Sequence, residues 1–131
     1  MLNRSLKKDK TKINSEEDLA RLIDWQKVNF LIPVIVQDYL TGGVLMLGYM
    51  NEEALCKSLQ EGKITYYSRT RKGPWTKGDT SGNFQYIKGV WLDCDNDSLL
   101  IKVKQVGQVC HTGRKTCFYK KYTNKKYVNK K

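Results

Sequence analysis

The 131-residue chain lacks the features that would assign it to a membrane or secreted class. No apolar run approaches the roughly 20 residues that a membrane-spanning helix needs. The basic N-terminus contains no hydrophobic stretch of the kind found in a secretory signal. Internal repeats and long linkers are absent as well. We therefore expect one domain of ordinary size in the cytoplasm, where cysteines are commonly free thiols or metal ligands.

Net charge is nearly absent from the body of the chain, although the whole sequence carries +11. Residues 1–12 hold five basic side chains and one acid, and residues 120–131 hold six lysines and no acid. Between them lie 13 basic and 12 acidic side chains. Such charge runs are usually solvated tails. We therefore expect basic tails at 1–14 and 120–131 around a single domain at 15–119, without a specific nucleic-acid partner.

The pattern of apolar residues predicts an α+β domain with a mainly antiparallel sheet and two or so short helices. One helix is expected from Ser15 to about Trp25 and another from Asn51 to about Glu61, since each begins with a capping residue and acids. A loop rich in glycine, hydroxyls and cations follows at 69–83. The predicted strands cover residues 33–37, 44–49, 64–68, 85–93, 99–106 and 116–119, the first two forming a hairpin.

A C-x₂₋₄-C knuckle, the usual element of a closed structural zinc site, is also missing. Cys94, Cys110 and Cys117 are instead spread along the C-terminal third of the chain. Three thiolates leave a fourth coordination position open, as in catalytic zinc sites. The alternative is that they are ordinary buried cysteines. Cys56 lies among apolar residues of the second predicted helix and is expected in the core.

Three aspartates, Asp93, Asp95 and Asp97, alternate around Cys94. On a strand they would share one face while Cys94 points to the other. Carboxylates this close repel unless a cation lies among them. We therefore expect a magnesium site, with a solvated acidic turn as the alternative. An EF-hand loop is excluded, because a serine and a lysine occupy the positions where that loop requires glycine and glutamate.

The single histidine, His111, directly follows Cys110. In an extended segment neighbouring side chains point to opposite sides, so His111 is not expected to complete the zinc site. An imidazole changes its protonation near neutral pH and can take a proton from water. His111 is therefore the candidate catalytic residue, and a buried, hydrogen-bonded histidine is the alternative.

The 69–83 loop combines the groups that hold a phosphate. Backbone amides of a glycine-containing turn, hydroxyls and guanidinium groups all bind phosphate oxygens, and an aromatic ring can stack on a base. Basic loops are also commonly just solvated, so the loop by itself does not assign a site. The candidate substrate-binding residues are Arg69, Arg71, Trp75, Lys77, Thr80, Ser81 and Gly82.

Taken together, these segments closely resemble those of the phosphoribosyl-AMP cyclohydrolases over roughly residues 30 to 119. The matching motifs are V-Q-D at 36–38, L-M-L-G-Y-M-N at 45–51, S-R-T-R at 68–71, W-T-K-G-D-T-S-G at 75–82, D-C-D-N-D at 93–97 and C-H-T-G-R-K-T-C-F at 110–118. Several motifs in one order are far more specific than any one of them. Pro74 departs from the pattern, because a larger aliphatic residue is expected before Trp75.

The resemblance implies a hydrolase of histidine biosynthesis that opens the adenine ring of 1-(5-phosphoribosyl)-AMP between N1 and C6. It also implies Zn²⁺ on the three cysteines, Mg²⁺ on the three aspartates and proton transfer by His111. The resemblance further implies that two chains form an intertwined homodimer. One zinc ion per subunit would then be shared, with Cys94 of one chain meeting Cys110 and Cys117 of the other. The pyrophosphohydrolase domain often fused to this enzyme is expected on another polypeptide.

Two other classes of protein would explain part of the sequence. A non-enzymatic zinc module could bind RNA through the basic tails, but it requires a closed four-ligand site and a more basic body. A zinc deaminase acting on a free nucleoside or base would carry an H-x-E…P-C-x-x-C signature, which this sequence lacks.

Overall fold

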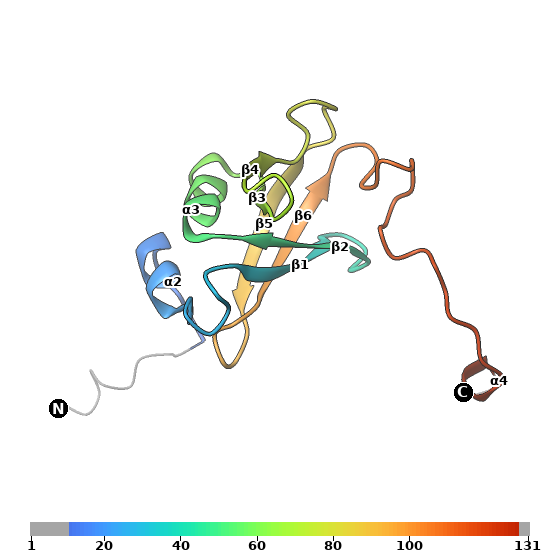
Figure 1. Cartoon of the computed structure of the whole chain (residues 1–131), viewed down its shortest axis with the longest axis horizontal. Helices are drawn as coiled ribbons and strands as arrows, with labels where there is room; N and C mark the ends of the chain where they lie inside the picture. Colours follow the sequence, from blue (N-terminus) through green and yellow to red (C-terminus); the bar gives the residue numbers. More distant parts are fainter. Residues whose placement is uncertain (1–10, 129–131) are drawn as a thin grey trace.

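The computed structural model describes residues 11–128, which form an α+β fold with three helices (Figure 1). Within this range no helix combines the length and the apolar character needed to cross a membrane. Parts of both predicted basic tails, at 1–10 and 129–131, lie outside the described residues. The elements in chain order are α2 (Glu16–Leu22), β1 (Ile32–Asp38), β2 (Val44–Met50), α3 (Glu52–Glu61), β3 (Thr65–Ser68), β4 (Gly73–Thr76), β5 (Gln85–Leu92), β6 (Leu99–Gln105) and α4 (Lys125–Val128).

A four-stranded sheet in the order β2-β1-β6-β5 forms the centre of the fold. β1 is antiparallel to β2, and β5 is antiparallel to β6. The central pair is the exception, because β1 and β6 run parallel. A parallel pair requires a long crossover connection. Here the crossover contains α3 and a separate two-stranded sheet of β3 and β4. The prediction of a mainly antiparallel α+β domain is confirmed.

Capping residues place both longer helices where the sequence predicted them. Ser15 accepts a hydrogen bond from the backbone N–H three residues on at 3.0 Å, and Asn51 does the same at 2.8 Å. α3 ends at Gly62, whose left-handed backbone (φ +75°) suits glycine. α2 is shorter than predicted, because Ile23 is already extended and the chain leaves the helix before Trp25.

The predicted 69–83 loop contains a strand that the sequence did not indicate. β4 pairs antiparallel with β3 and has no second neighbouring strand in the described part of the chain. Pro74 lies within β4, where its missing N–H is tolerated because an edge strand leaves one side unpaired. The glycine and proline residues that favoured the prediction of a loop therefore lie in an edge strand.

The strand predicted at 116–119 is wrong. The structure shows no ladder there. The Thr116 hydroxyl donates to the carbonyl oxygen of Val44 at 2.8 Å, and the Cys117 N–H donates to that of Leu45 at 2.7 Å. These hydrogen bonds hold the segment against the start of β2, but they do not extend into a sheet.

The two faces of the sheet differ in what covers them. On the inner face, alternate residues of β1 and β6 are almost completely buried. The outer face carries an apolar row, because Leu47 pairs with Ile35, Ile35 with Leu100, and Leu100 with Trp91. Residues paired across strands share a face. Three of the four side chains are 39–49% exposed, so this row is an apolar strip at the surface.

Candidate active site

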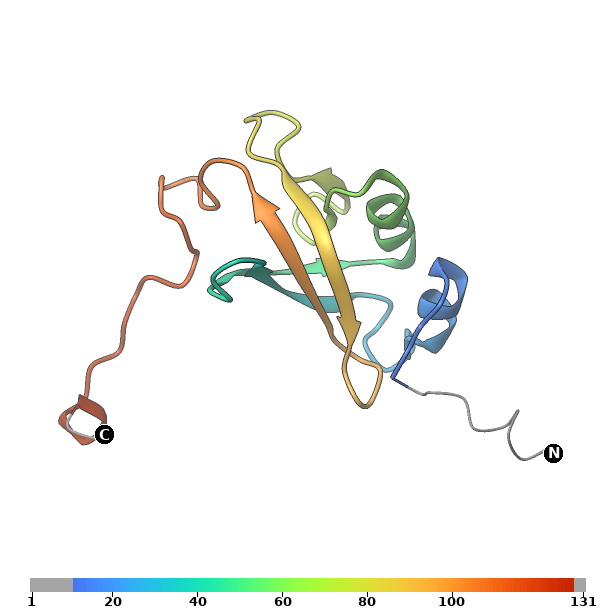
Figure 2. The same ribbon diagram turned by 180° about the vertical axis from the view of Figure 1, so that it is seen from behind.

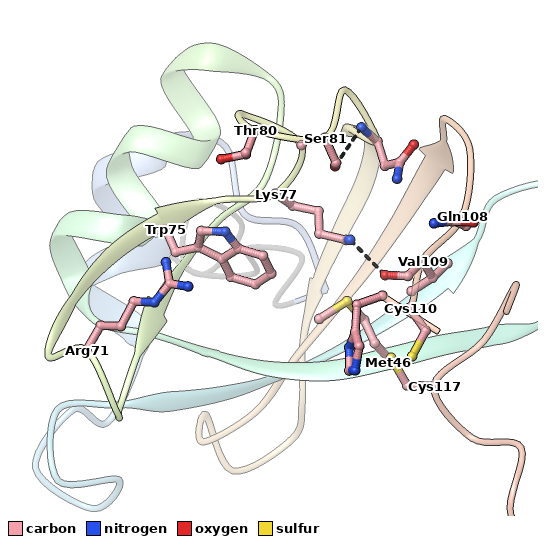
Figure 3. Close-up of a pocket in the computed structure, with 13 residues that line it drawn as sticks. Met46, Arg71, Trp75, Lys77, Thr80, Ser81, Gln108, Val109, Cys110 and Cys117 are labelled. Carbon is pink, nitrogen blue, oxygen red and sulfur yellow. Dashed lines mark hydrogen bonds between the residues drawn. The ribbon is translucent and has the colours of Figure 1, made fainter. Parts of the chain in front are cut away.

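A cleft of about 640 Å³ opens between β4, the loop after it and the segment after β6 (Figure 3). It is lined by Met46, Arg71, Trp75, Lys77, Gly78, Thr80, Ser81, Asn83, Gln108, Val109, Cys110, His111 and Cys117. Two groups of predicted residues, about 30 positions apart in the sequence, therefore share one cleft. Five lining residues were not predicted as site residues, although each lies within or close to one of the quoted motifs: Met46, Gly78, Asn83, Gln108 and Val109.

Two of the predicted substrate-binding residues do not line this cleft. The guanidinium group of Arg69 stacks on the ring of Tyr49, 4.1 Å from its centre. Gly82 instead closes the turn, where its N–H donates to the carbonyl oxygen of Gly78 at 2.7 Å. The remaining five, Arg71, Trp75, Lys77, Thr80 and Ser81, do line it.

A tight turn presents Cys110 at the edge of the cleft. The N–H groups of Val109 and Cys110 both lie 3.2 Å from the carbonyl oxygen of Arg114 and donate to it. The N–H of Gly113 donates to the Cys110 carbonyl oxygen at 2.9 Å, and Gly113 adopts φ +89°. Glycine is suited to this left-handed backbone. The turn thus fixes the cysteine backbone without a strand.

The thiols of Cys110 and Cys117 influence each other. The Thr112 hydroxyl donates to Cys110 Sγ at 3.1 Å, and this bond, with that from the Thr112 N–H, lowers the pKa of Cys110. Burial of the thiol, followed by the neighbouring Cys110, raises the pKa of Cys117. Neither residue is in the core, because Cys117 is exposed and Cys110 is half-buried. A cation held by both sulfurs would stabilise both thiolates.

Cys94 is distant from this thiol pair within one chain. It lies in the turn that joins β5 to β6, whereas Cys110 and Cys117 follow the other end of β6 (Figures 1 and 2). A seven-residue strand such as β6 spans roughly 20 Å. Cys94 is exposed, which argues against the alternative of a core cysteine. Cys56, predicted in the core, is half-buried on α3.

The three aspartates lie on that β5–β6 turn, so their predicted placement on a strand is wrong. Asn96 adopts φ +64°, and the chain folds back on itself. Asp93 accepts hydrogen bonds from the N–H groups of Asp97 and Ser98 at 2.9 and 3.1 Å, and from the Ser98 hydroxyl at 2.6 Å. The carboxylates of Asp93, Asp95 and Asp97 come within 4.8 Å of one another. Among residues 11–128 this is the one cluster of three side chains suited to a metal ion.

Lys27 supplies positive charge to this cluster. Its Nζ lies 2.8 Å from Asp97 Oδ2 and 3.0 Å from Asp95 Oδ2. Hydrogen bonds to Asp97 and then Asp95 raise the pKa of Lys27. Partial burial raises the pKa of Asp93, but hydrogen bonds from Ser98 and Asp97 outweigh it, and the net shift is downward. The cluster thus holds a cation already, and its oxygen ligands fit Mg²⁺.

Lys77 is the buried cation of the cleft. Its residue surface is 7% exposed, and its Nζ donates to the Val109 carbonyl oxygen at 2.7 Å (Figure 3). Burial lowers the pKa of Lys77, while Cys117 and Cys110 act in the opposite direction. Its Nζ also lies 5.8 Å from the centre of the Trp75 ring.

His111 lines the cleft with an exposed side chain. The alternative of a buried, hydrogen-bonded histidine is therefore wrong. An exposed imidazole in the same cleft as two thiols and two cations is accessible to water and to a bound molecule. That is what a group that transfers protons requires.

Comparison with known proteins gives a consistent result. The family model described as phosphoribosyl-AMP cyclohydrolase matches residues 46–119. The histidine biosynthesis bifunctional protein HisIE of Haemophilus influenzae is 56% identical over 109 residues, which are 83% of this chain and 49% of that protein. The phosphoribosyl-AMP cyclohydrolases of Clostridium beijerinckii and Clostridium botulinum are 55% identical over 98 residues and 52% over 104. Those alignments cover 75% and 79% of this chain, and 90% and 95% of the relatives. The chain therefore spans about half the length of the bifunctional relative.

Proposed function

The chain belongs to the phosphoribosyl-AMP cyclohydrolase family, and we propose that it catalyses the ring opening for which that family is named. The substrate would be 1-(5-phosphoribosyl)-AMP, whose adenine ring is hydrolysed between N1 and C6 in histidine biosynthesis. One observation carries the proposal. A single cleft joins an accessible histidine, two thiols and a cationic, hydroxyl-containing loop.

The loop side of the cleft suits a phosphorylated nucleotide. Arg71 is exposed, and Thr80 and Ser81 bring two hydroxyl groups to the lining of the same cleft. Guanidinium and hydroxyl groups are common ligands of phosphate oxygens. Trp75 is 38% exposed and offers a ring face on which a base can stack. Arg69 and Gly82, outside the cleft lining, stay predictions from the sequence.

We assign zinc to Cys110 and Cys117 of one chain together with Cys94 of the partner subunit. The donor chemistry fits, because thiolates suit zinc and three of them leave a position open. Zinc, when bound, would supply an activated water. His111 would accept the proton of the attacking water on a ring nitrogen and return it to N1 as the N1–C6 bond breaks. Magnesium is assigned to the Asp93, Asp95 and Asp97 cluster, which suits an oxygen-liganded ion.

A homodimer would bring the separated ligands together. Because β6 lies between Cys94 and the other two cysteines, one chain alone does not present all three to one ion. A second copy could do so if the β5–β6 turn of each subunit approached the cleft of the other. The exposed apolar row of Leu47, Ile35 and Trp91 on the sheet is a surface that such a copy would cover.

Ring opening can be followed directly by ultraviolet absorbance with the zinc- and magnesium-loaded chain and 1-(5-phosphoribosyl)-AMP. We expect turnover, its loss with a zinc chelator, and a decrease of roughly 10²–10⁴-fold in His111→Ala. His111 is exposed, so that variant should keep the parent's melting temperature. No ring opening by the loaded parent would contradict the proposed function, and near-full activity in His111→Ala would contradict the role of the histidine.

Sharing of the zinc site is tested by mixing two inactive variants, Cys94→Ser and Cys110→Ser. In a mixed dimer one site combines intact Cys110 and Cys117 of one chain with intact Cys94 of the other. The second site lacks both Cys94 and Cys110. After random exchange of subunits we expect recovery of roughly a quarter of parent activity. Sedimentation velocity establishes that dimers are present. Absence of recovery despite demonstrated exchange would contradict the shared site.

A further inference from the structure

Lys77 connects the two walls of the cleft (Figure 3). Its backbone follows β4, and its N–H donates to the carbonyl oxygen of Ile64 at 3.0 Å. Its Nζ reaches the opposite wall and donates to the carbonyl oxygen of Val109 at 2.7 Å. Val109 directly precedes Cys110. One side chain thus joins the small sheet to the segment that carries two of the assigned zinc ligands.

The base from which Lys77 extends is rigid. Thr76, the preceding residue, is 5% exposed, and its hydroxyl lies 2.6 Å from that of Thr65. The N–H of Thr65 donates to the hydroxyl of Ser58 on α3 at 2.8 Å. A lysine is ordinarily flexible, but here its backbone and its ammonium group are both fixed. The position of Val109 is therefore tied to the core of the protein.

The charge of Lys77 has no carboxylate partner among residues 11–128. The ion pairs in that part of the chain involve Arg21 and Lys27. An ammonium group has three N–H donors, and in the described residues one of them is used, by Val109. Burying a cation without an opposite charge is unfavourable. The acidic side chains that line the cleft together with Lys77 are the thiols of Cys110 and Cys117.

We propose that Lys77 is a positioning residue for zinc in this protein. Its hydrogen bond to Val109 fixes the approach of Cys110, and its positive charge offsets the net negative charge of zinc on three thiolates. This inference rests on the assignment of zinc under the proposed function. It gives Lys77 a task different from holding a substrate phosphate, for which the exposed Arg71 is available.

The test measures zinc affinity of the full-length chain by competition with a chromophoric chelator. Lys77→Met keeps the length of the side chain and removes its charge and donors. We expect its zinc dissociation constant to rise about 10- to 100-fold, as when other groups around a metal site are removed. Lys77→Arg should recover much of the affinity. Lys57→Met, at an exposed position of α3, is the matched control and should bind zinc like the parent. Cobalt(II) spectra should show weaker thiolate charge-transfer bands in Lys77→Met alone.

Other outcomes would overturn the proposal. Unchanged zinc affinity in a folded Lys77→Met, with a raised KM for the nucleotide, would make Lys77 a phosphate ligand. If Lys77→Met has unchanged zinc affinity and only a lowered melting temperature, Lys77 stabilises the fold and does not position zinc. If Lys77→Met does not fold, Lys77→Gln removes the charge and keeps a donor, and the same comparison applies. A parent that binds zinc but opens no ring would contradict the proposed function while leaving this inference standing; a parent that binds no zinc would overturn it.

Discussion

The ammonium nitrogen of Lys27 lies 2.8 Å from the carboxylate of Asp97, across 70 positions of the sequence. The ammonium group of Lys27 and a divalent cation would compete for the same carboxylate oxygens of Asp95 and Asp97. We expect Lys27→Met to bind Mn²⁺, used as a probe for the proposed magnesium site, roughly fivefold more tightly, because a nearby like charge is removed. Electron paramagnetic resonance of free Mn²⁺ gives the binding curve.

Lys57→Met again serves as the control for loss of one positive charge. If both variants bind Mn²⁺ equally tightly, the change reflects net charge alone. Weaker binding in Lys27→Met would mean that the lysine supports the site instead of competing for it.

Gly48 allows close contact between β2 and the aromatic ring above it. A methyl group at this position would come within 2.5 Å of Cδ1 of Tyr66. Tyr66 is 2% exposed and its hydroxyl is hydrogen-bonded to Gln85, so the ring cannot move freely. We expect Gly48→Ala to lower the free energy of unfolding by about 1–3 kcal/mol in urea denaturation. Gly73→Ala is the control, since the nearest atom there is 4.0 Å away. Equal stability of the two variants would refute the argument.

Ser58 is a buried link between α3 and β3. Its hydroxyl donates to the carbonyl oxygen of Ala54 at 2.8 Å and accepts the N–H of Thr65 at 2.8 Å. Ser58→Ala leaves a buried N–H without its partner, which costs about 1–3 kcal/mol. Thermal unfolding and amide exchange at Thr65 measure the effect. The exposed neighbour Lys57→Ala should change neither, and an unaltered Thr65 exchange rate in Ser58→Ala would speak against the link.

Asp38 gives the first hairpin a pH dependence. The N–H groups of Thr41 and Leu40 donate to its carboxylate at 2.8 and 3.0 Å, and chiefly the Thr41 bond holds the pKa of Asp38 below its ordinary value. A group with a lowered folded pKa stabilises the protein above its unfolded pKa of about 3.9, and this stabilisation is lost as pH falls through the folded pKa. Asp38→Asn should therefore be less stable than the parent at pH 7, and the difference should shrink towards pH 2.5. A constant difference in urea midpoint over that range would contradict the expectation.

Local signals predicted the elements whose causes are local. Ser15, Asn51 and Gly62 begin or end helices through bonds to residues three or four positions away, so the sequence alone reveals them. Runs rich in strand-forming apolar residues likewise located β1 and β6. β4 was missed because Gly73 and Pro74 favour a turn, and only the adjacent β3 makes an edge strand of them.

The arrangement of the site depended on contacts that no local pattern contains. The aspartates were expected to gather, and they do, but through a turn with Asn96 at positive φ instead of a strand. Lys27 meets Asp95 from 68 positions away, and nothing in its own segment signals that contact. Lys77 was placed in a loop of cations, while the structure buries it. Burial of a single lysine is decided by the segment that packs over it.

The parallel pairing of β1 with β6 also influences the order in which parts of the chain fold. It joins residues 34–38 to residues 99–103, whereas the β1–β2 and β3–β4 hairpins close within short stretches of chain. Closing so long a loop has a high entropic cost and slows folding. The aspartate turn immediately precedes β6, and the Cys110 segment follows it. The aspartate turn itself closes locally with the β5–β6 hairpin, but the segment of Cys110 and Cys117 meets β2 only after β6 has paired with β1. The proposed thiolate site would therefore form at the end of folding, and its metal ion would not nucleate the fold.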